Sequence, residues 1–536
     1  MLISMHQSDK DWWKNAVIYQ IYPRSFLDSN KDGIGDIKGI ISKIEYLKSL
    51  EVDAIWLSPI FKSPMNDMGY DVSDYFDIDP LFGNMDDFEE LINICHESEL
   101  KLIIDQVYSH TSDEHPYFKQ SKKDKENDKA DWYVWADPKE DGGPPNNWLS
   151  VFGGSAWEWS SKRRQYYLHN FLKSQPDLNF HNIDVQNWVL SIADFWLKKG
   201  VDGFRLDVAN YYFHDPKLRD NPSRKNIKIP FANPYGMQDH KYSINQKENF
   251  SFLKKLRKVS EKYKNSILLG EIDNKDLQIK YTEGSDKLHL AYSFELLRKE
   301  LSTDSIQNTI DYFYSSTKDG WPCWCFSNHD VKRHISRWSR DKSNLDDLAK
   351  ISCALLLSLK GTVCIYQGEE LGQTETKLEF EELTDPPGIE FWPEEAGRDG
   401  CRTPMVWNSQ KLNAGFSEVK PWLPVKKEQK QKSLDLQEDK NDSVLSFYKE
   451  MIKARKKNFG REIYDFDFIS SNDLLIFSKG SSEKIFCIFN LDNETKVLQD
   501  KKYQKLQILP SNNLTKDKDG YVFKPFGFAF FNLKLS

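Results

Sequence analysis

The sequence predicts an α/β fold, a (β/α)8 barrel of the TIM type with an inserted subdomain after the third strand and an antiparallel β domain at the C-terminal end. Three observations support this prediction. Short apolar, β-branched runs alternate with longer helical patterns, the alternation repeats eight times, and after about residue 460 the pattern changes to strands separated by turn residues. Repeated strand–helix alternation indicates a parallel sheet, and eight such units close into a barrel.

Eight short apolar runs provide the expected barrel strands. They cover residues 16–26, 53–59, 100–107, 203–208, 266–272, 288–294, 324–330 and 362–370. Between them, residues 37–50, 184–200 and 345–361 carry apolar side chains at three- and four-residue spacing, which predicts helices. After a last helix over 443–458, the segments DFDFIS, LLIFSKG, EKIFCIFNL and GFAFFNLK indicate the strands of the C-terminal domain.

The long connections all follow strands. Residues 108–183, 209–247 and 371–440 are long and rich in aromatic and polar residues, whereas connections from helix to strand are short. The long loops therefore gather at the C-terminal face of the barrel, where barrels of this type carry their active sites. We expect the barrel to comprise residues 1–107 and 179–459, the inserted subdomain 108–178, and a C-terminal β-sandwich domain 460–536.

Composition and charge exclude several classes of protein. The chain has 536 residues with a formal net charge of −8, which argues against a general binder of nucleic acid or of membrane surfaces. No apolar run reaches the length of about 20 residues needed to span a bilayer, and the first residues lack the apolar core of a signal peptide. The seven cysteines are scattered and odd in number, unlike a disulfide framework. We therefore expect a cytoplasmic monomer or homodimer.

Carboxylates gather at the ends of the predicted strands. Asp105, Asp207, Glu271 and Asp330 each lie at or near a strand end, and strand ends of a closed barrel converge on one pocket. Arg205 precedes Asp207 by two residues, so both side chains lie on the same face and the guanidinium can hold Asp207 ionised. Glu271 is expected near the other carboxylates, which would raise its pKa.

Two roles are open to these four acids. For any one of them alone, the favoured interpretation is a cap of the following helix. Four together, with His110 and His329 beside them in sequence, favour a functional site. Glycoside hydrolysis needs two carboxyl groups that flank the scissile bond, one basic and one protonated.

Five short motifs carry a resemblance to a known family. They are DQVYSH (105–110), QPDLNF (175–180), GFRLDV (203–208), LLGEI (268–272) and FSNHD (326–330). In this order and at these strand ends, the chain resembles the α-amylase superfamily, glycoside hydrolase family 13, and within it the α-glucosidase/oligo-1,6-glucosidase branch. The resemblance covers nearly the whole chain.

The resemblance implies a role for each residue of these motifs. It implies that Asp207 is the nucleophile, Glu271 the general acid/base, and Asp330 the acid that orients the 2- and 3-hydroxyls of the sugar. It also implies that His110 and His329 hydrogen-bond the glucosyl ring and that Arg205 supports the nucleophile. The first motif departs from the usual pattern, because Ser109 stands where the family has Asn, so calcium binding there does not carry over.

Further segments match the family's sugar pocket. GYDVSDY (69–75) resembles the segment that closes the pocket, which implies that Tyr70 stacks on the sugar and Asp71 binds distal hydroxyls. GRDGCRTPMVW (397–407) resembles another segment of the branch and implies that Arg402 contacts the innermost glucose.

Two loop aromatics, Phe152 and Phe171, are expected to wall this pocket, with ordinary loop packing as the alternative. Val208 follows the predicted nucleophile. In the family, Val at this position accompanies α-1,6 cleavage and Thr or Ala accompanies α-1,4, so Val208 favours isomaltose-type substrates.

The segment DSNKDGIGD (28–36) indicates a structural cation, Ca²⁺ or Mg²⁺. Its oxygen donors follow the spacing of the front of a calcium loop, and similar loops bind a cation in oligo-1,6-glucosidase relatives. The ligands would be Asp28, Asn30, Asp32, the carbonyl of Ile34 and Asp36. The closing Glu of such loops is absent. The alternative is a Gly- and Asp-rich turn without metal.

Together these features predict a retaining, exo-acting α-glucosidase. It would remove terminal α-glucosyl units from short oligosaccharides or α-glucosides, α-1,4 or α-1,6 linked or both, by double displacement. Retention requires the two carboxyls to stand about 5–5.5 Å apart. A transglucosylase or sucrose isomerase with the same catalytic residues is one alternative. A non-enzymatic relative of the membrane-anchored amino-acid-transporter heavy chains is a remote one, because this chain keeps the catalytic residues.

Overall fold

The computed structural model describes residues 11–227, 231–272, 274–339, 344–458, 465–469, 471, 473–480, 484–500, 502–518 and 520–533. Its centre is one sheet of eight strands, in which each neighbouring pair is parallel. In chain order the strands are β1 (Val17–Ile21), β2 (Ala54–Leu57), β5 (Lys101–Gln106), β9 (Gly203–Leu206), β10 (Ile267–Ile272), β11 (Leu290–Ser293), β12 (Cys323–Trp324) and β13 (Thr362–Tyr366).

The sheet closes on itself. The strand order runs β11-β10-β9-β5-β2-β1-β13-β12, and a parallel bridge between Ala291 of β11 and Pro322, next to β12, joins the two ends. Each of the eight strands overlaps one of the eight predicted segments. The predicted (β/α)8 barrel is therefore confirmed. Each observed strand is shorter than the apolar run that predicted it, because the run continues into the loop that follows the strand.

Alternation along the strands separates the barrel interior from its outer layer. In β2, Ala54 and Trp56 belong to one apolar cluster and Ile55 and Leu57 to another. The first cluster also contains Ile103 of β5, Leu269 of β10 and Leu290 of β11, and it fills the inside of the barrel, because side chains at every second position share a face. The other cluster lies between the strands and the helices.

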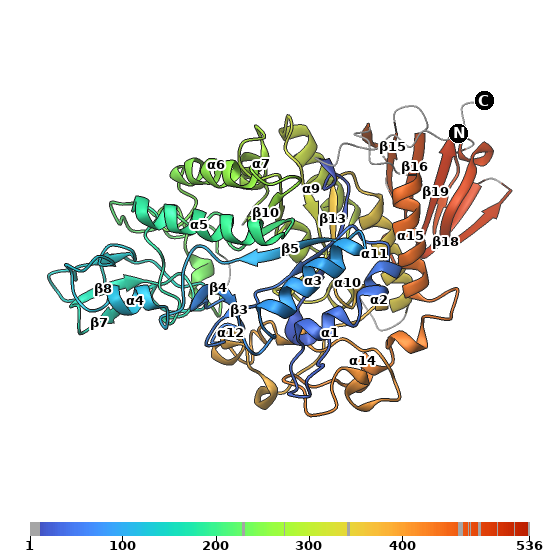
Figure 1. The fold of residues 1–536 in the computed structure, drawn as a ribbon. Helices are drawn as coiled ribbons and strands as arrows, with labels where there is room; N and C mark the ends of the chain where they lie inside the picture. Colours follow the sequence, from blue (N-terminus) through green and yellow to red (C-terminus); the bar gives the residue numbers. More distant parts are fainter. Residues whose placement is uncertain are drawn as a thin grey trace.

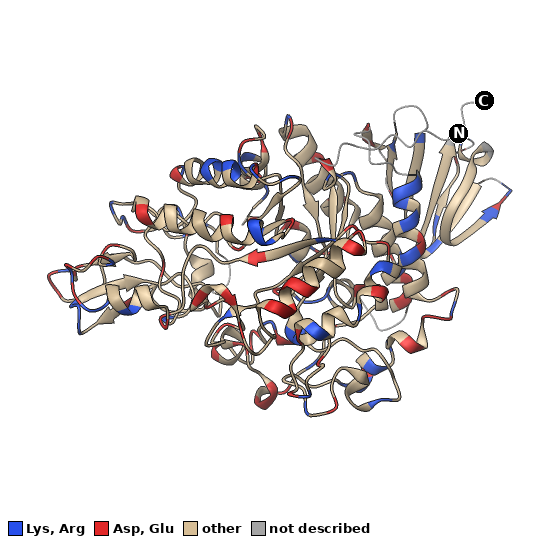
Figure 2. Cartoon of the chain, in the orientation of Figure 1, with Lys and Arg blue, Asp and Glu red and all other residues tan. Residues whose placement is uncertain are grey.

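Helices surround the barrel (Figure 1). They include α1 (Ile37–Ile41), α2 (Ile44–Ser49), α3 (Met85–Glu97), α5 (Ile183–Lys199), α6 (Glu248–Ser260), α7 (Lys275–Thr282), α9 (Thr303–Ser316), α10 (His334–Trp338) and α11 (Leu345–Ser358). The helix expected over 37–50 is divided at Ser42 and Lys43. The helix expected over 184–200 ends at Gly200, whose φ of 111° suits glycine as a C-cap. Acidic and basic residues are mixed along these helices (Figure 2).

Two insertions extend the C-terminal face. After β2, the hairpin of β3 (Phe61–Lys62) and β4 (Asp74–Ile78) precedes α3. After β5, the chain forms α4 (Pro116–Ser121) and a three-stranded antiparallel sheet. Its strands are β6 (Trp135–Ala136), β7 (Trp157–Ser160) and β8 (Gln165–Leu168). This subdomain follows the third barrel strand, as predicted, and projects from one end of the molecule (Figure 1).

A six-stranded antiparallel sheet follows α15 (Val444–Asn458) at the opposite end of the molecule (Figure 1). Its strands are β14 (Phe466–Ile469), β15 (Leu475–Lys479), β16 (Lys484–Phe489), β17 (Lys496–Leu498), β18 (Gln507–Asp517) and β19 (Gly520–Leu533). Phe477, Phe489 and Phe528 join the main core, whereas Ile488 and Phe531 belong to a second apolar cluster. The predicted antiparallel domain is confirmed. The exact domain boundaries stay predictions.

Two further features concern the length of the helices and the state of the cysteines. In the part of the chain that the structure describes, no helix is both long enough and apolar enough to cross a bilayer. All seven cysteines are buried and carry free thiols.

Candidate active site

The barrel interior brings the predicted acids together. Ile103, Leu269 and Arg205 point inward from β5, β10 and β9, so two residues later Asp105, Glu271 and Asp207 point inward as well. β9 lies between β5 and β10 in the sheet. Side chains from the two outer strands therefore reach Arg205 on the middle one.

Arg205 is the centre of this cluster. Its Nη1 lies 2.8 Å and 2.9 Å from the two oxygens of Asp105 and 2.7 Å from Oδ1 of Asp207. Its Nη2 lies 2.7 Å from Oε2 of Glu271 and 2.7 Å from the hydroxyl of Tyr292. The Arg205 side chain is completely buried. One guanidinium thus contacts three carboxyl groups away from water.

Glu271 is held by three donors. The Tyr292 hydroxyl donates to its Oε1 at 3.1 Å, and Arg205 and the backbone N–H of Val208 reach its Oε2, the latter at 3.0 Å. Val208 itself adopts φ 33°, a left-handed conformation that is rare for a β-branched residue, and such strained residues cluster at functional sites.

Burial acts strongly on the titration of Asp207. Burial raises its pKa, the charge of Arg205 opposes this, and the neighbouring carboxyls of Glu271 and Asp105 raise it further. The pKa of Asp105 rises to about 6, also because of burial. The net effect raises the pKa of Asp207 well above its usual value, so the charge of Arg205 opposes burial without outweighing it. The ionised state expected for Asp207 from the sequence stays a prediction.

The pKa of Asp330 is shifted in the opposite direction to that of Asp207. Burial alone would raise the pKa of its carboxyl, but His329, Arg398 and Arg402 outweigh this and lower the pKa. Arg402 Nη2 lies 3.0 Å and Arg398 Nη1 3.3 Å from Asp330 Oδ1. Asp330 is therefore a permanently charged acceptor at neutral pH.

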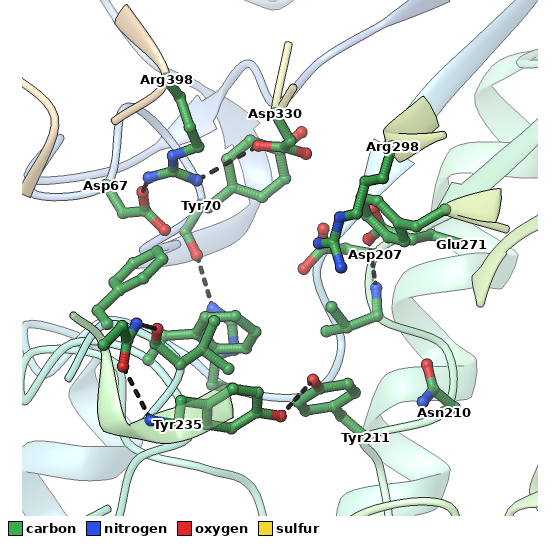
Figure 3. Close-up of a pocket in the computed structure, with 17 residues that line it drawn as sticks. Asp67, Tyr70, Asp207, Asn210, Tyr211, Tyr235, Glu271, Arg298, Asp330 and Arg398 are labelled. Atoms are coloured by element: carbon green, nitrogen blue, oxygen red, sulfur yellow. Dashed lines mark hydrogen bonds and ion pairs between the residues drawn. The ribbon is translucent and has the colours of Figure 1, made fainter. Parts of the chain in front are cut away.

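A cavity of about 330 Å³ opens above these carboxyls, near the lower end of the roughly 300–1,000 Å³ usual for ligand sites. Figure 3 shows its wall. The lining residues are Asp67, Tyr70, His110, Val151, Phe152, Phe171, Asp207, Val208, Asn210, Tyr211, Asn233, Tyr235, Glu271, Phe294, Arg298, Asp330 and Arg398. Carboxylates lie beside aromatic rings, a combination that suits a sugar with polar edges and apolar faces.

Seven of the predicted site residues line this cavity. They are Tyr70, His110, Phe152, Phe171, Asp207, Glu271 and Asp330. Arg205, His329 and Arg402 lie directly behind the wall, fully buried, and contact residues that line it.

His329 and His110 are uncharged and hold Tyr70, which lines the cavity, in place. The Tyr70 and His329 rings are stacked with their planes 6° apart, and the Tyr70 hydroxyl lies 2.5 Å from His329 Nε2. Burial lowers the pKa of His329 to about 3 and that of His110 to about 4. Nε2 of His110 lies 2.9 Å from the Tyr70 carbonyl oxygen, so this histidine fixes the segment that carries Tyr70.

The structure places Asp71 away from the cavity and Asp67 on its wall. Asp71 is fully buried, and its carboxyl accepts hydrogen bonds from Ser63 Oγ and from the backbone N–H groups of Asn66 and Asp67. The contact with distal hydroxyls that the sequence suggested for Asp71 thus has no geometric basis, because this carboxyl faces its own loop. Asp67 instead binds Arg398 Nη2 at 2.8 Å.

Several other lining residues were not anticipated. Arg398 lies four residues before Arg402 in the matched segment and joins Asp67, Asp330 and Asp385. Tyr211 and Tyr235 come from the long loop after β9, and their hydroxyls are 2.9 Å apart. The sequence marked these loops as aromatic and polar, but loop conformation decides which of their side chains reach the cavity.

The predicted cation loop is folded around its own acids. Asp28 accepts hydrogen bonds from the backbone N–H groups of Lys31 and Gly33, and Asp36 accepts from Ser29 and Gly39. Asp32 is exposed and accepts from Ile34 N–H. The donor chemistry fits a hard cation, since all five predicted ligands offer oxygen. Among the described residues, no three acidic, histidine or cysteine side chains are grouped as a metal site requires, so the cation stays a prediction.

Comparison with known proteins adds independent information. A family model described as the alpha-amylase catalytic domain matches residues 20–463. A probable alpha-glucosidase of Rhizobium meliloti is 49% identical over 518 residues, which cover 94% of both chains. An oligo-1,6-glucosidase of Heyndrickxia coagulans is 37% identical, with 90% of this chain and 93% of the relative covered.

Solved structures agree in fold. The crystal structure of an alpha-glucosyl transfer enzyme superposes with a TM-score of 0.93 at 45% identity, covering 97% of this chain and 99% of the other. An isomaltulose synthase from Erwinia rhapontici superposes with a TM-score of 0.88 at 31% identity, covering 97% and 99%.

Proposed function

Because the chain belongs to the family of alpha-amylase catalytic domains and is a glycoside hydrolase, we propose that it is a retaining, exo-acting α-glucosidase. Its substrates would be short oligosaccharides or α-glucosides with a terminal α-glucosyl unit. One observation carries this proposal: Asp207 and Glu271, from neighbouring strands, contact the same buried guanidinium and line the same small cavity.

The proposed chemistry is a double displacement. Asp207 Oδ attacks the anomeric carbon while Glu271 gives its proton to the leaving oxygen, so the glycosidic bond breaks as the bond to Asp207 forms. Glu271 then takes a proton from water, and the oxygen of that water replaces Asp207 at the same carbon. The product is α-glucose, because two inversions restore the configuration.

The opposite side of the cavity supports recognition of the terminal glucose. Asp67 and Asp330 are carboxyl acceptors held by Arg398, and Tyr70 provides an aromatic face beside them. Hydrogen bonds from sugar hydroxyls to ionised carboxylates are among the stronger polar contacts available. The small volume of the cavity favours a single glucosyl unit at this end, and hence exo action on short substrates.

Transfer of the glucosyl unit is the second candidate activity. The relatives in solved structures include an alpha-glucosyl transfer enzyme and an isomaltulose synthase, and both activities would use the same covalent intermediate. The outcome then depends on whether water or a second sugar reaches the anomeric carbon. Product analysis at high sugar concentration distinguishes the two.

We also propose that the loop over 28–36 holds one Ca²⁺ or Mg²⁺ through Asp28, Asn30, Asp32, the Ile34 carbonyl and Asp36. The loop follows β1 and its Asp36 caps α1. Bound there, the ion would stiffen the link between the first strand and the first helix and would take no part in the chemistry.

The proposal is tested with the purified full-length chain. Glucose release is measured with maltose, isomaltose, sucrose, trehalose and p-nitrophenyl α-glucoside. The first anomer released is followed by proton NMR with p-nitrophenyl α-glucoside, whose single glucose is the transferred unit, and we expect α-glucose to form first. Release of β-glucose first, or of oligosaccharides from internal bonds of long chains, would contradict the proposal. Asp207→Asn serves as the inactive control.

A further inference from the structure

We infer that the leaving-group side of the cavity recognises an oxyanion, and that Arg298 makes the contact. The preferred substrate or acceptor would then carry a carboxylate or a phosphate on the group joined to the terminal glucose. The inference rests on the proposed function, because it assumes that Glu271 protonates the leaving oxygen. It adds a class of substrate to that function.

The position of Arg298 places it beside the predicted acid. Arg298 is the last residue of the short helix α8 (Glu295–Arg298), which directly follows β11. Tyr292 of β11 is the register partner of Glu271 on β10 and donates a hydrogen bond to it. Figure 3 shows Arg298 on the same side of the cavity as Glu271, across from Asp67 and Arg398. The terminal glucose is proposed to occupy that far side, so Arg298 faces the other half of the substrate.

Arg298 differs from the other arginines of the site in its contacts. Arg205 binds three carboxyls, and Arg398 binds Asp67, Asp330 and Asp385. Within the part of the chain that the structure describes, the Arg298 side chain has no hydrogen bond or ion pair. Its guanidinium lies over the ring of Phe294, with the guanidinium carbon 4.3 Å from the ring centroid.

This arrangement suits a ligand rather than a structural role. The Arg298 side chain is exposed to solvent in the cavity, and stacking on Phe294 restricts the orientation of the planar guanidinium. A guanidinium held in this way presents a fork of N–H groups that matches the two oxygens of a carboxylate or phosphate.

Charge in the rest of the cavity does not oppose such a ligand at this position. Four carboxyls line the cavity, but Asp207 and Glu271 are paired with Arg205, and Asp67 and Asp330 with Arg398. The described lining therefore leaves one guanidinium without an acid partner, that of Arg298. A neutral sugar would offer it only hydroxyl groups, which make weaker hydrogen bonds to a cation than an oxyanion does.

The test compares two α-glucosides of nearly equal shape. p-Nitrophenyl α-glucoside is neutral, whereas p-carboxyphenyl α-glucoside carries a carboxylate where the first has a nitro group. kcat/KM is measured for both with wild type, Arg298→Gln and Arg298→Lys. The ratio of the two values within each variant removes effects common to both substrates. A second arm compares trehalose with trehalose 6-phosphate, which distinguishes carboxylate from phosphate recognition.

We expect Arg298→Gln to lower the carboxyphenyl-to-nitrophenyl ratio by about tenfold or more, the size usual for a lost charge-assisted hydrogen bond. Arg298→Lys should retain part of the preference, and added salt should weaken it in wild type. Lys299→Gln is the matched control: it removes the neighbouring positive charge, which pairs with Glu295 rather than lining the cavity, and should leave the ratio unchanged.

The proposed function and the inference about Arg298 can fail independently, with different results. If wild type releases no glucose from the neutral glucoside, the proposed function fails. If it does so but Arg298→Gln changes both members of each pair equally, Arg298 acts on the reaction in general and the inference is wrong. A phosphate preference without a carboxylate preference, or the reverse, supports the inference and identifies the oxyanion.

Discussion

The Arg205 guanidinium lies 2.7 Å from the Glu271 carboxyl, through a different nitrogen from the one that holds the predicted nucleophile. Arg205 is thus a shared anchor for both proposed catalytic carboxyls and not a support for one alone. Arg205→Gln should lower kcat by about 100-fold or more. It should also lower the free energy of unfolding by about 3–5 kcal/mol, because it leaves buried carboxyls without their cation.

Activity on p-nitrophenyl α-glucoside and urea unfolding check this prediction. Lys262→Gln is the control, since Lys262 pairs with Asp194 and both side chains are exposed, and an exposed ion pair contributes little to stability. It should leave both measurements close to wild type. If Arg205→Gln unfolded like wild type, the shared-anchor interpretation would be wrong.

Val208 is predicted to influence linkage preference. It lines the cavity, and its backbone N–H donates to Glu271. Val208→Thr keeps the β-branched shape and the backbone while adding a hydroxyl, so it changes the side-chain contact alone. We expect the ratio of kcat/KM for isomaltose over that for maltose to fall by about tenfold, within the range that one apolar contact discriminates. An unchanged ratio, or wild-type enzyme that cleaves maltose but no isomaltose, would contradict the assignment.

Asp177, in the QPDLNF segment, should make stability depend on pH. Burial raises the pKa of its carboxyl to about 8, although Asn170 donates two hydrogen bonds to Oδ2. Its unfolded-state pKa is about 3.9. The stability that protonated Asp177 contributes is therefore complete below about pH 4 and is lost as pH rises toward 8. Relative to Asp177→Asn, wild type should lose up to about 1.4 kcal/mol of unfolding free energy per pH unit over this range.

Denaturant unfolding of both proteins at pH 5, 6, 7 and 8 measures this difference. Asp215→Asn is the matched control, because hydrogen bonds from Arg219 lower the pKa of Asp215 to about 2. Its contribution is complete above about pH 4, so the difference from wild type should be constant from pH 5 to 8. A difference for Asp177→Asn that is equally constant would rule out a protonated Asp177 at neutral pH.

Removal of divalent cations tests the proposed metal loop. Chelation should lower Tm, and addition of Ca²⁺ or Mg²⁺ should restore it, because a ligand of the folded state stabilises by mass action. Asp32 is exposed, and its carboxyl accepts hydrogen bonds from Asn30 and Ile34 of the same loop. Asp32→Ala should therefore abolish the response to metal while matching wild type in chelator. A Tm that is indifferent to chelator and metal in wild type would exclude the ion.

Much of the site follows from local rules that a sequence displays. Alternation along β9 places Arg205 and Asp207 on one face. The parallel register places Asp105 on β5 and Leu269 on β10 level with Arg205, so Glu271 follows two residues later on the same inward face. These relations depend only on the period of a strand and on closure of the barrel, so they were predictable. The same rules identified all eight barrel strands.

The positions of loop residues in the site could not be predicted in the same way. Met68 and Gly69, with φ of 53° and 107°, turn the chain between Asp67 and Asp71, so the conformation of the loop decides which acid faces the cavity. Likewise, no pattern marks Arg298 or Tyr235, because their positions depend on packing between segments distant in sequence. Strand β18 was also missed, since Pro510, Asn512 and Asn513 interrupt its pattern.

The central claim is that Asp207 forms a covalent bond to the glucosyl unit. A 5-fluoroglucosyl fluoride slows release of such an intermediate, so that digestion and tandem mass spectrometry can locate it. The account predicts one added fluoroglucosyl group on the peptide that contains GFRLDV, attached to Asp207. A label on Asp105, Glu271 or Asp330, or turnover that never accumulates a covalent species, would contradict it.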